Sequence, residues 1–158
     1  MIEIEQYLDK NIESVDANIK DKNIYYQIKK ATCEKYVKKY FGGWNEEEQK
    51  KYNNKIFDES LKQNCFKIIK VANKPVGFFG YSIFDREIGC VTIQIITITE
   101  KNKIFNGLLN YLFALSNKLN LPIYAKSFLA SKDVKLYKKA GFKIMETTKS
   151  HYLLKREI

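Results

Sequence analysis

Few side chains in this sequence have the types and spacing that nucleophilic or metal chemistry requires. The three cysteines, Cys33, Cys65 and Cys90, are an odd number and have no metal-ligand spacing. His151 is the only histidine, and it has no cysteine or carboxylate at ligand spacing, so we interpret it as a surface or boundary residue. A Ser-His-Asp triad cannot be argued from one histidine, because triads are assembled in space. The sequence therefore predicts no disulfide framework and no metal site.

Five tyrosines could stack on nucleic-acid bases: Tyr25, Tyr26, Tyr36, Tyr40 and Tyr52. Their helical spacing favours packing in the core and at its boundary. The net charge of +10 could also attract a polyanion, but the lysines are scattered along the chain instead of forming one block. Solvated lysines are the favoured interpretation, and we do not expect nucleic acid as a partner. A coenzyme that carries phosphates would use the same positive field.

The chain has the length and composition of one folded domain over residues 1–158, with 45% hydrophobic residues available for a core. No apolar run approaches the roughly twenty residues of a membrane span. The start, Met1 to Asp9, alternates charged and hydrophobic residues, unlike a signal peptide. We therefore expect a cytoplasmic protein that does not bind a membrane and is a monomer or a homodimer.

Periodicity predicts a pair of helices in the first part of the chain. Ile2 to Leu8 could form a short first strand. Apolar residues recur at three- and four-residue spacing from Ile24 to Phe41, and Gly42-Gly43 ends this helix. Asn45 followed by three glutamates is typical of the start of a second helix.

The remainder predicts strands that alternate with helices. Three consecutive strands are indicated by their β-branched and aromatic residues, at Phe66 to Val71, Val76 to Phe84 and Cys90 to Ile98. The unbroken third strand should be central and covered on both faces. The elements after it are a leucine-rich helix from Leu108 to Leu119, a strand at Ile123 to Leu129, a helix at Asp133 to Ala140, and short strands near Phe142 to Met145 and His151 to Lys155. This order predicts an α/β (α+β) fold with a mixed, mostly antiparallel central sheet flanked by helices.

The segment Leu136-Tyr137-Lys138-Lys139-Ala140-Gly141-Phe142, together with this order of elements, resembles the GNAT superfamily of N-acetyltransferases. That family has a Leu-Tyr-x-x-x-Gly-Phe signature where its fourth helix ends. A second similarity links Gly43-Trp44-Asn45-Glu46 to the Gly-Trp-Asp-Glu segment of one bacterial branch. The resemblance covers nearly the whole chain. It implies that an acetyl group is transferred from acetyl-CoA to an amine in a ternary complex, without a metal.

The resemblance also implies catalytic and coenzyme-binding roles for particular residues. Tyr137 matches the tyrosine that protonates the departing thiolate, although it could equally serve only to pack its helix on the sheet. Near Ile96 to Ile98 the family separates the central strand from its neighbour, and a backbone N–H there can stabilise an oxyanion. The coenzyme-binding residues that we expect are Ile96, Thr97, Ile98, Lys103, Ile104, Phe105, Asn106 and Gly107.

The pyrophosphate loop departs from the family pattern Gln/Arg-x-x-Gly-x-Gly/Ala. Alignment on the helix leucines puts Glu100, Lys103 and Phe105 at its key positions, and a shifted register recovers only Asn102 and Gly107. Two outcomes remain open. Helix-start amides with nearby lysines could still bind phosphate, or Phe105 could fill the phosphate position in a catalytically inactive, GNAT-like binding protein. Ala130, where the family often has asparagine, favours the second outcome.

The acceptor side has three candidate residues, Trp44, Tyr40 and Gln94. Trp44 lies where the family places its acceptor loop, although it could instead cap the helix pair. Gln94 is a neutral amide on the strand where many relatives have glutamate. A water chain or one of Glu46, Glu47 and Glu48 could act as the base. The acceptor stays open among polyamines, aminoglycosides, amino acids, peptide N-termini and protein lysines.

Overall fold

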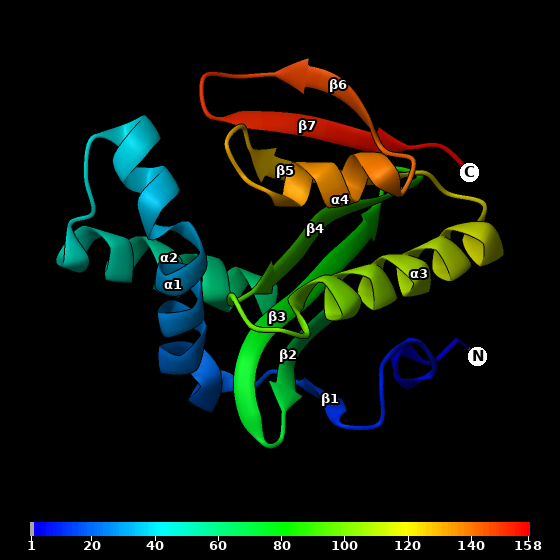
Figure 1. Cartoon of the computed structure of the whole chain (residues 1–158), viewed down its shortest axis with the longest axis horizontal. Helices are drawn as coiled ribbons and strands as arrows, with labels where there is room; N and C mark the ends of the chain where they lie inside the picture. Colours follow the sequence, from blue (N-terminus) through cyan, green and yellow to red (C-terminus); the bar gives the residue numbers. More distant parts are fainter. Residues whose placement is uncertain (1) are drawn as a thin grey trace.

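A seven-stranded sheet runs through the computed structural model, which describes residues 2–158 (Figure 1). The strand order is β1-β2-β3-β4-β5-β7-β6. Only β4 and β5 pair in parallel, and the other neighbours are antiparallel, so the sheet is mixed and mostly antiparallel, as predicted. The strands are β1 (Ile12–Asp16), β2 (Cys65–Val71), β3 (Lys74–Phe84), β4 (Glu87–Ile95), β5 (Ile123–Phe128), β6 (Lys143–Thr147) and β7 (His151–Arg156).

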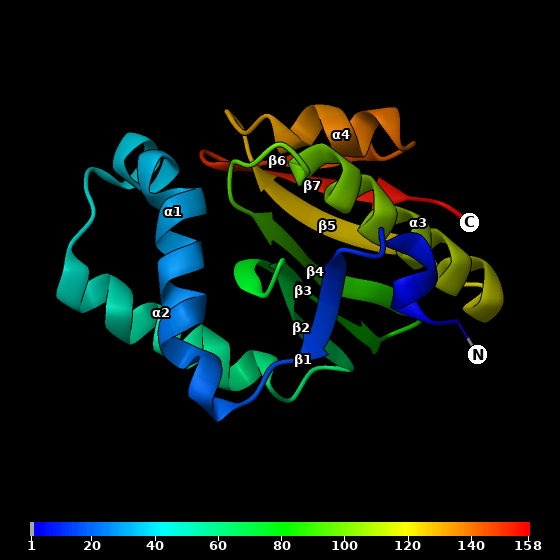
Figure 2. The same ribbon diagram turned by 60° about the horizontal axis from the view of Figure 1, so that its bottom comes forward.

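Two pairs of helices cover opposite faces of the sheet (Figure 2). The pairs are α1 (Lys22–Phe41) with α2 (Glu46–Ser60), and α3 (Lys101–Leu119) with α4 (Asp133–Lys139). Alternation along the strands divides the core between these faces, because successive side chains point to opposite sides. Ile68 and Phe78 join the α1–α2 core, while their neighbours Ile69 and Phe79 join the α3 core.

Local signals explain where the helices begin and end. α1 ends at Gly42, whose φ of +83° is the left-handed conformation that glycine adopts without penalty. The Asn45 side chain accepts a hydrogen bond from the Glu48 N–H at 2.9 Å and caps α2. Tyr25 is 2% exposed among Phe57, Phe66 and Phe78, in agreement with a packing role.

The prediction for the N-terminal segment was wrong. Ile2 to Leu8 contains a short 3-10 helix, η1 (Ile4–Tyr7), and the first strand follows it as β1. Ile4 is buried in the core that η1 shares with α3, so the segment gains more from covering α3 than from pairing with a strand. A second 3-10 helix, η2 (Ile19–Asp21), leads into α1.

The central strand contains a β-bulge. Gly80 pairs with Thr92 but Ser82 pairs with Gly89, so β4 has one residue more than β3 between these pairs. Cys90 at the bulge has a φ of +50°, in the left-handed region. A bulge of this kind bends a strand and increases its twist. β4 also ends at Ile95, before the predicted end at Ile98.

No helix within residues 2–158 is both long and apolar enough to cross a membrane.

Candidate functional site

β4 and β5 separate halfway along their length. The two strands pair at Ile88↔Ile123 and Val91↔Ala125, and no further pair follows between them in the described part of the chain. The separated ends border a cleft of about 1190 Å³. Tyr137 of α4 and Lys29 of α1 both line it, although these helices lie on opposite faces of the sheet. The cleft therefore passes between the two strands from one face to the other.

The separation leaves backbone groups of β4 without a strand partner. The Ile96 N–H donates to the Val76 carbonyl at 2.9 Å, on the β3 side. Since N–H groups alternate in direction along an antiparallel strand, the Ile95 N–H points away from β3 and into the gap. The Ile96 N–H, which lies in the segment Ile96 to Ile98 where a backbone donor was expected, is therefore already paired and is not a free donor. Thr97 lines the cleft, whereas Ile96 and Ile98 pack against the core.

α3 begins at Lys101, three residues before the expected amides of Ile104 to Gly107. The Ile104 N–H already donates to the Glu100 carbonyl at 2.9 Å. The N–H groups of Asn102 and Lys103 precede this first intrahelical bond, and they belong to the positive end of the helix. The Lys101 ammonium lies in the cleft wall, 3.0 Å from Asp133 Oδ1.

The remaining expected coenzyme residues lie outside the cleft. Ile104 and Phe105 are 0% exposed in the core, and the Phe105 ring packs edge-on against Tyr137 at 5.1 Å. A Cβ on Gly107 would lie 2.3 Å from the Tyr7 carbonyl oxygen, so this glycine permits the close approach of η1. These residues follow the start of α3, where they pack in the core or against η1.

Lys103 and Asn106 are on the outer surface of α3. The Lys103 ammonium pairs with Asp9 at 2.7 Å, in the N-terminal segment, and Asn106 is exposed. Lys101, and not Lys103, is therefore the lysine of this helix start that lines the cleft.

Tyr137 lies where the core meets the cleft. It is 3% exposed and contacts the rings of Phe105 and Phe142, both at 5.1 Å, while it also lines the cleft. Burial raises the pKa of Tyr137 above its ordinary value of 10, and the Asp133 carboxylate raises it further. The phenol is therefore protonated throughout the physiological pH range and can donate a proton or a hydrogen bond.

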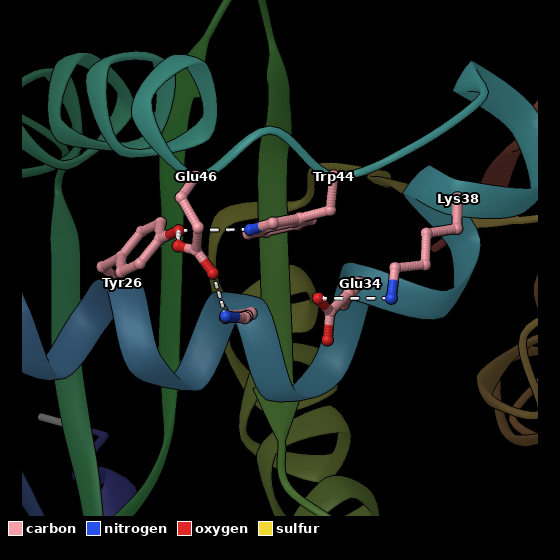
Figure 3. A network of polar contacts seen from close by, with 6 residues as sticks. Tyr26, Glu34, Lys38, Trp44 and Glu46 are labelled. Carbon is pink, nitrogen blue, oxygen red and sulfur yellow. Dashed lines mark hydrogen bonds and ion pairs between the residues drawn. The ribbon is translucent and has the colours of Figure 1, made fainter.

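A polar network fixes Trp44, which lines the cleft and lies between α1 and α2 (Figure 3). Its indole N–H donates to the Tyr26 hydroxyl at 3.2 Å, and this hydroxyl donates to Glu46. Lys30 also donates to Glu46, and these two bonds lower the pKa of the Glu46 carboxyl. Glu46 is consequently held as a structural anion that joins α2 to α1.

Aromatic rings from three elements form the wall beside α1. Phe128 of β5 stacks on Tyr36 at 5.1 Å and contacts the ring of His151 at 4.2 Å. Tyr40 stacks on Phe128 at 6.0 Å, just outside the residues that line the cleft. Gln94 lines the cleft and accepts a hydrogen bond from the Cys33 thiol at 3.7 Å.

Sequence reasoning missed His151 as a cleft residue. β7 pairs with β5 so that His151 lies opposite Phe128, and the cleft therefore includes its ring. Burial lowers the pKa of His151 from its ordinary value of 6.5, and the charges of Lys126 and Lys29 lower it further. Its Nδ1 lies 2.7 Å from the Ser150 hydroxyl. No local pattern in the sequence could have signalled this position, because it depends on strand pairing.

Within residues 2–158, no group of three or more His, Cys, Asp or Glu side chains is arranged to hold a metal ion.

Known proteins resemble this chain in structure and not in sequence. No protein-family model and no curated sequence matches it. The PaiA N-acetyltransferase of Thermoplasma acidophilum, solved with coenzyme A, matches 93% of this chain and 99% of its own, with a TM-score of 0.67 at 17% identity. Naa50 of Arabidopsis thaliana, solved with the bisubstrate analogue CoA-Ac-MVNAL, matches 94% of this chain and 99% of its own, with a TM-score of 0.67 at 16% identity. An aminoglycoside 6'-acetyltransferase of type Ii matches 92% of this chain and 96% of its own, with a TM-score of 0.67 at 17% identity.

Proposed function

From the GNAT fold that the chain shares with these solved structures, we propose that it is an acetyl-CoA-dependent N-acetyltransferase. The acetyl group passes directly to a primary amine in a ternary complex. The cleft between β4 and β5 carries this proposal, because it joins the start of α3 on one face to an open pocket on the other. Coenzyme and acceptor can then meet from opposite sides of the sheet.

The coenzyme side has groups suited to phosphates and to a thioester. The first-turn amides of α3 and the Lys101 ammonium provide positive charge for a diphosphate. The Lys101 ammonium can release the Asp133 carboxylate and pair with a phosphate while it stays in the cleft wall. The free Ile95 N–H lies where the strands separate, and there it can stabilise negative charge that develops on a carbonyl oxygen.

Side chains of the cleft carry out two proton transfers. Tyr137 donates a proton to the departing thiolate, since its phenol remains protonated. His151 is kept neutral, so its imidazole can accept the proton of the attacking ammonium directly or through water. Glu46 is less suited to this role because it is bonded to Lys30 and Tyr26.

The inactive binding protein is the alternative. It requires Phe105 to fill the phosphate position. The burial of Phe105 in the α3 core supports the enzyme instead.

The test compares two lysines of one helix start, Lys101→Met and Lys103→Met. We expect the first to raise the Kd for acetyl-CoA about tenfold, because it removes the cation that lines the cleft, and the second to leave it within about twofold. Calorimetric titration measures both. Acetyl-CoA should also raise the melting temperature of the wild type, since a ligand that binds only the folded state stabilises it.

Turnover is then followed as thiol release with a panel of amines. An absence of coenzyme binding would contradict the proposal. Failure to bind the coenzyme would support the inactive alternative, and coenzyme binding without transfer to any amine would contradict the proposed acetyl transfer.

A further inference from the structure

The acceptor side of the cleft has an excess of positive charge. Lys29 of α1 and Lys126 of β5 both line it, and Lys35 lies at its rim with its ammonium 5.0 Å from the centre of the Tyr36 ring. None of the ion pairs formed among residues 2–158 includes Lys29, Lys35 or Lys126. Lys29 is half-buried, and an unpaired ammonium in such a position favours an anion from outside.

The carboxylates that line the cleft do not offset this charge. Asp133 pairs with Lys101 on the opposite face of the sheet. Glu48 and Glu59 are exposed residues of α2. The charged groups that shift the pKa of His151 are Lys126 and Lys29, and both lower it. The site around His151 is therefore positive before any ligand enters.

We infer that the acceptor amine also carries a carboxylate, which pairs with Lys29 and Lys126 while the amino group points toward the gap between β4 and β5. This inference rests on the proposed function and narrows its substrate to small amino carboxylates, such as free amino acids. The stacked rings of Tyr36 and Phe128 offer an apolar wall for the side chain of that molecule. Polyamines and aminoglycosides are polycations, and the same charges repel them.

The experiment compares acceptors that differ only at the carboxylate. Phenylalanine, phenylalaninamide and phenethylamine share a ring and an amine, and spermidine represents the polycations. We expect kcat/KM, corrected for the fraction of neutral amine, to be about tenfold or more higher for phenylalanine than for the other three, since partly buried charge pairs contribute more than exposed ones. An equal or higher value for phenethylamine or spermidine would overturn the inference.

Substitutions separate charge recognition from a structural role. Lys29→Met and Lys126→Met should lower kcat/KM for phenylalanine much more than kcat/KM for phenethylamine, which has no carboxylate. Lys29→Glu should shift the preference toward spermidine. Lys118→Met removes an exposed lysine of α3 outside the cleft and serves as the control, with no change expected. Equal losses for phenylalanine and phenethylamine would contradict the inference.

Direct binding keeps the inference testable without turnover. Titration of phenylalanine and phenethylamine into the wild type saturated with desulfo-coenzyme A should show tighter binding of phenylalanine, and Lys126→Met, at an exposed position, should reduce the difference. If coenzyme binds and this preference is missing, the inference fails while the proposed function stands. If coenzyme does not bind, the proposed function fails, and titration of the free protein still decides the preference.

Discussion

Tyr137 belongs to the core and to the cleft at once. Its ring fills the space between Phe105 and Phe142, and its position also borders the gap between β4 and β5. The two interpretations of this residue from the sequence, packing and proton donation, are therefore compatible. A substitution that keeps the ring separates them, because only the hydroxyl is lost.

Tyr137→Phe should lower kcat about 10²-fold, since a positioned general acid contributes about this much. The Kd for acetyl-CoA should stay within about twofold, because the ring and its contacts remain. Stopped-flow measurement of thiol release, with calorimetric titration of the same sample, checks both values. An unchanged kcat would remove Tyr137 from the acid role and leave it a packing residue.

His151 makes stability depend on pH. Its folded-state pKa is depressed below the ordinary value of 6.5, so the unfolded chain binds its proton more readily than the native protein. The contribution of His151 is thus fully present above pH 6.5 and is lost as the pH falls through the folded-state pKa. Urea unfolding of the wild type and of His151→Gln should show a steeper loss of stability on acidification for the wild type. Parallel curves for the two proteins would contradict this account.

Four of the residues that were predicted for the site line the cleft. Tyr137 was predicted from the Leu-Tyr-x-x-x-Gly-Phe segment, and Trp44, Gln94 and Thr97 were predicted from the resemblance to the family. Lys29 and His151 carry no such signal, because pairing between distant strands and helices brings them together. How the expected residues bind or react stays a prediction until the variants are measured.

The start of α3 shows why the coenzyme residues were hard to place from sequence. Aligning the leucines with a family loop assumed that the helix begins near Ile104, but it begins at Lys101. Ile104 and Phe105 therefore follow the helix start and lie on the side of α3 that faces the core, where hydrophobic burial fixes them. Because the helix begins three residues earlier than assumed, Lys101 lines the cleft, and the expected residue Lys103 does not.

Gly107→Ala tests the contact between α3 and η1. Alanine favours a helix by about 1 kcal/mol over glycine, but its Cβ would lie 2.3 Å from the Tyr7 carbonyl oxygen. We expect a net loss of about 1–2 kcal/mol in the free energy of unfolding, because the backbone of η1 must move. Urea unfolding measures the loss. Asn110→Ala, at an exposed position of the same helix, should change stability by less than about 0.5 kcal/mol, and an equal loss in both variants would contradict the proposed clash.

The periodicity of apolar residues predicted most elements of the whole molecule, but not all of them. All four α-helices and the strands after α2 were predicted, because their apolar residues recur with the period of one element. The N-terminal strand was misplaced, since η1 and β1 are short and gain their stability from α3 and β2. The position of β7 between β5 and β6 follows from long-range pairing, which no local pattern encodes.

Cys90 is the additional residue that the bulge accommodates in β4. Ile88 and Val91 are an odd number of residues apart, yet both are buried in the same core, because the bulge takes up the residue between Gly89 and Val91. Deleting that residue would leave Ile88 and Val91 two residues apart, so a regular strand would still bury both, and Val91 would then lie opposite Tyr81. Loss of this one residue would therefore straighten the strand without exposing its buried face, whereas loss of two residues there would turn one half of the strand inside out.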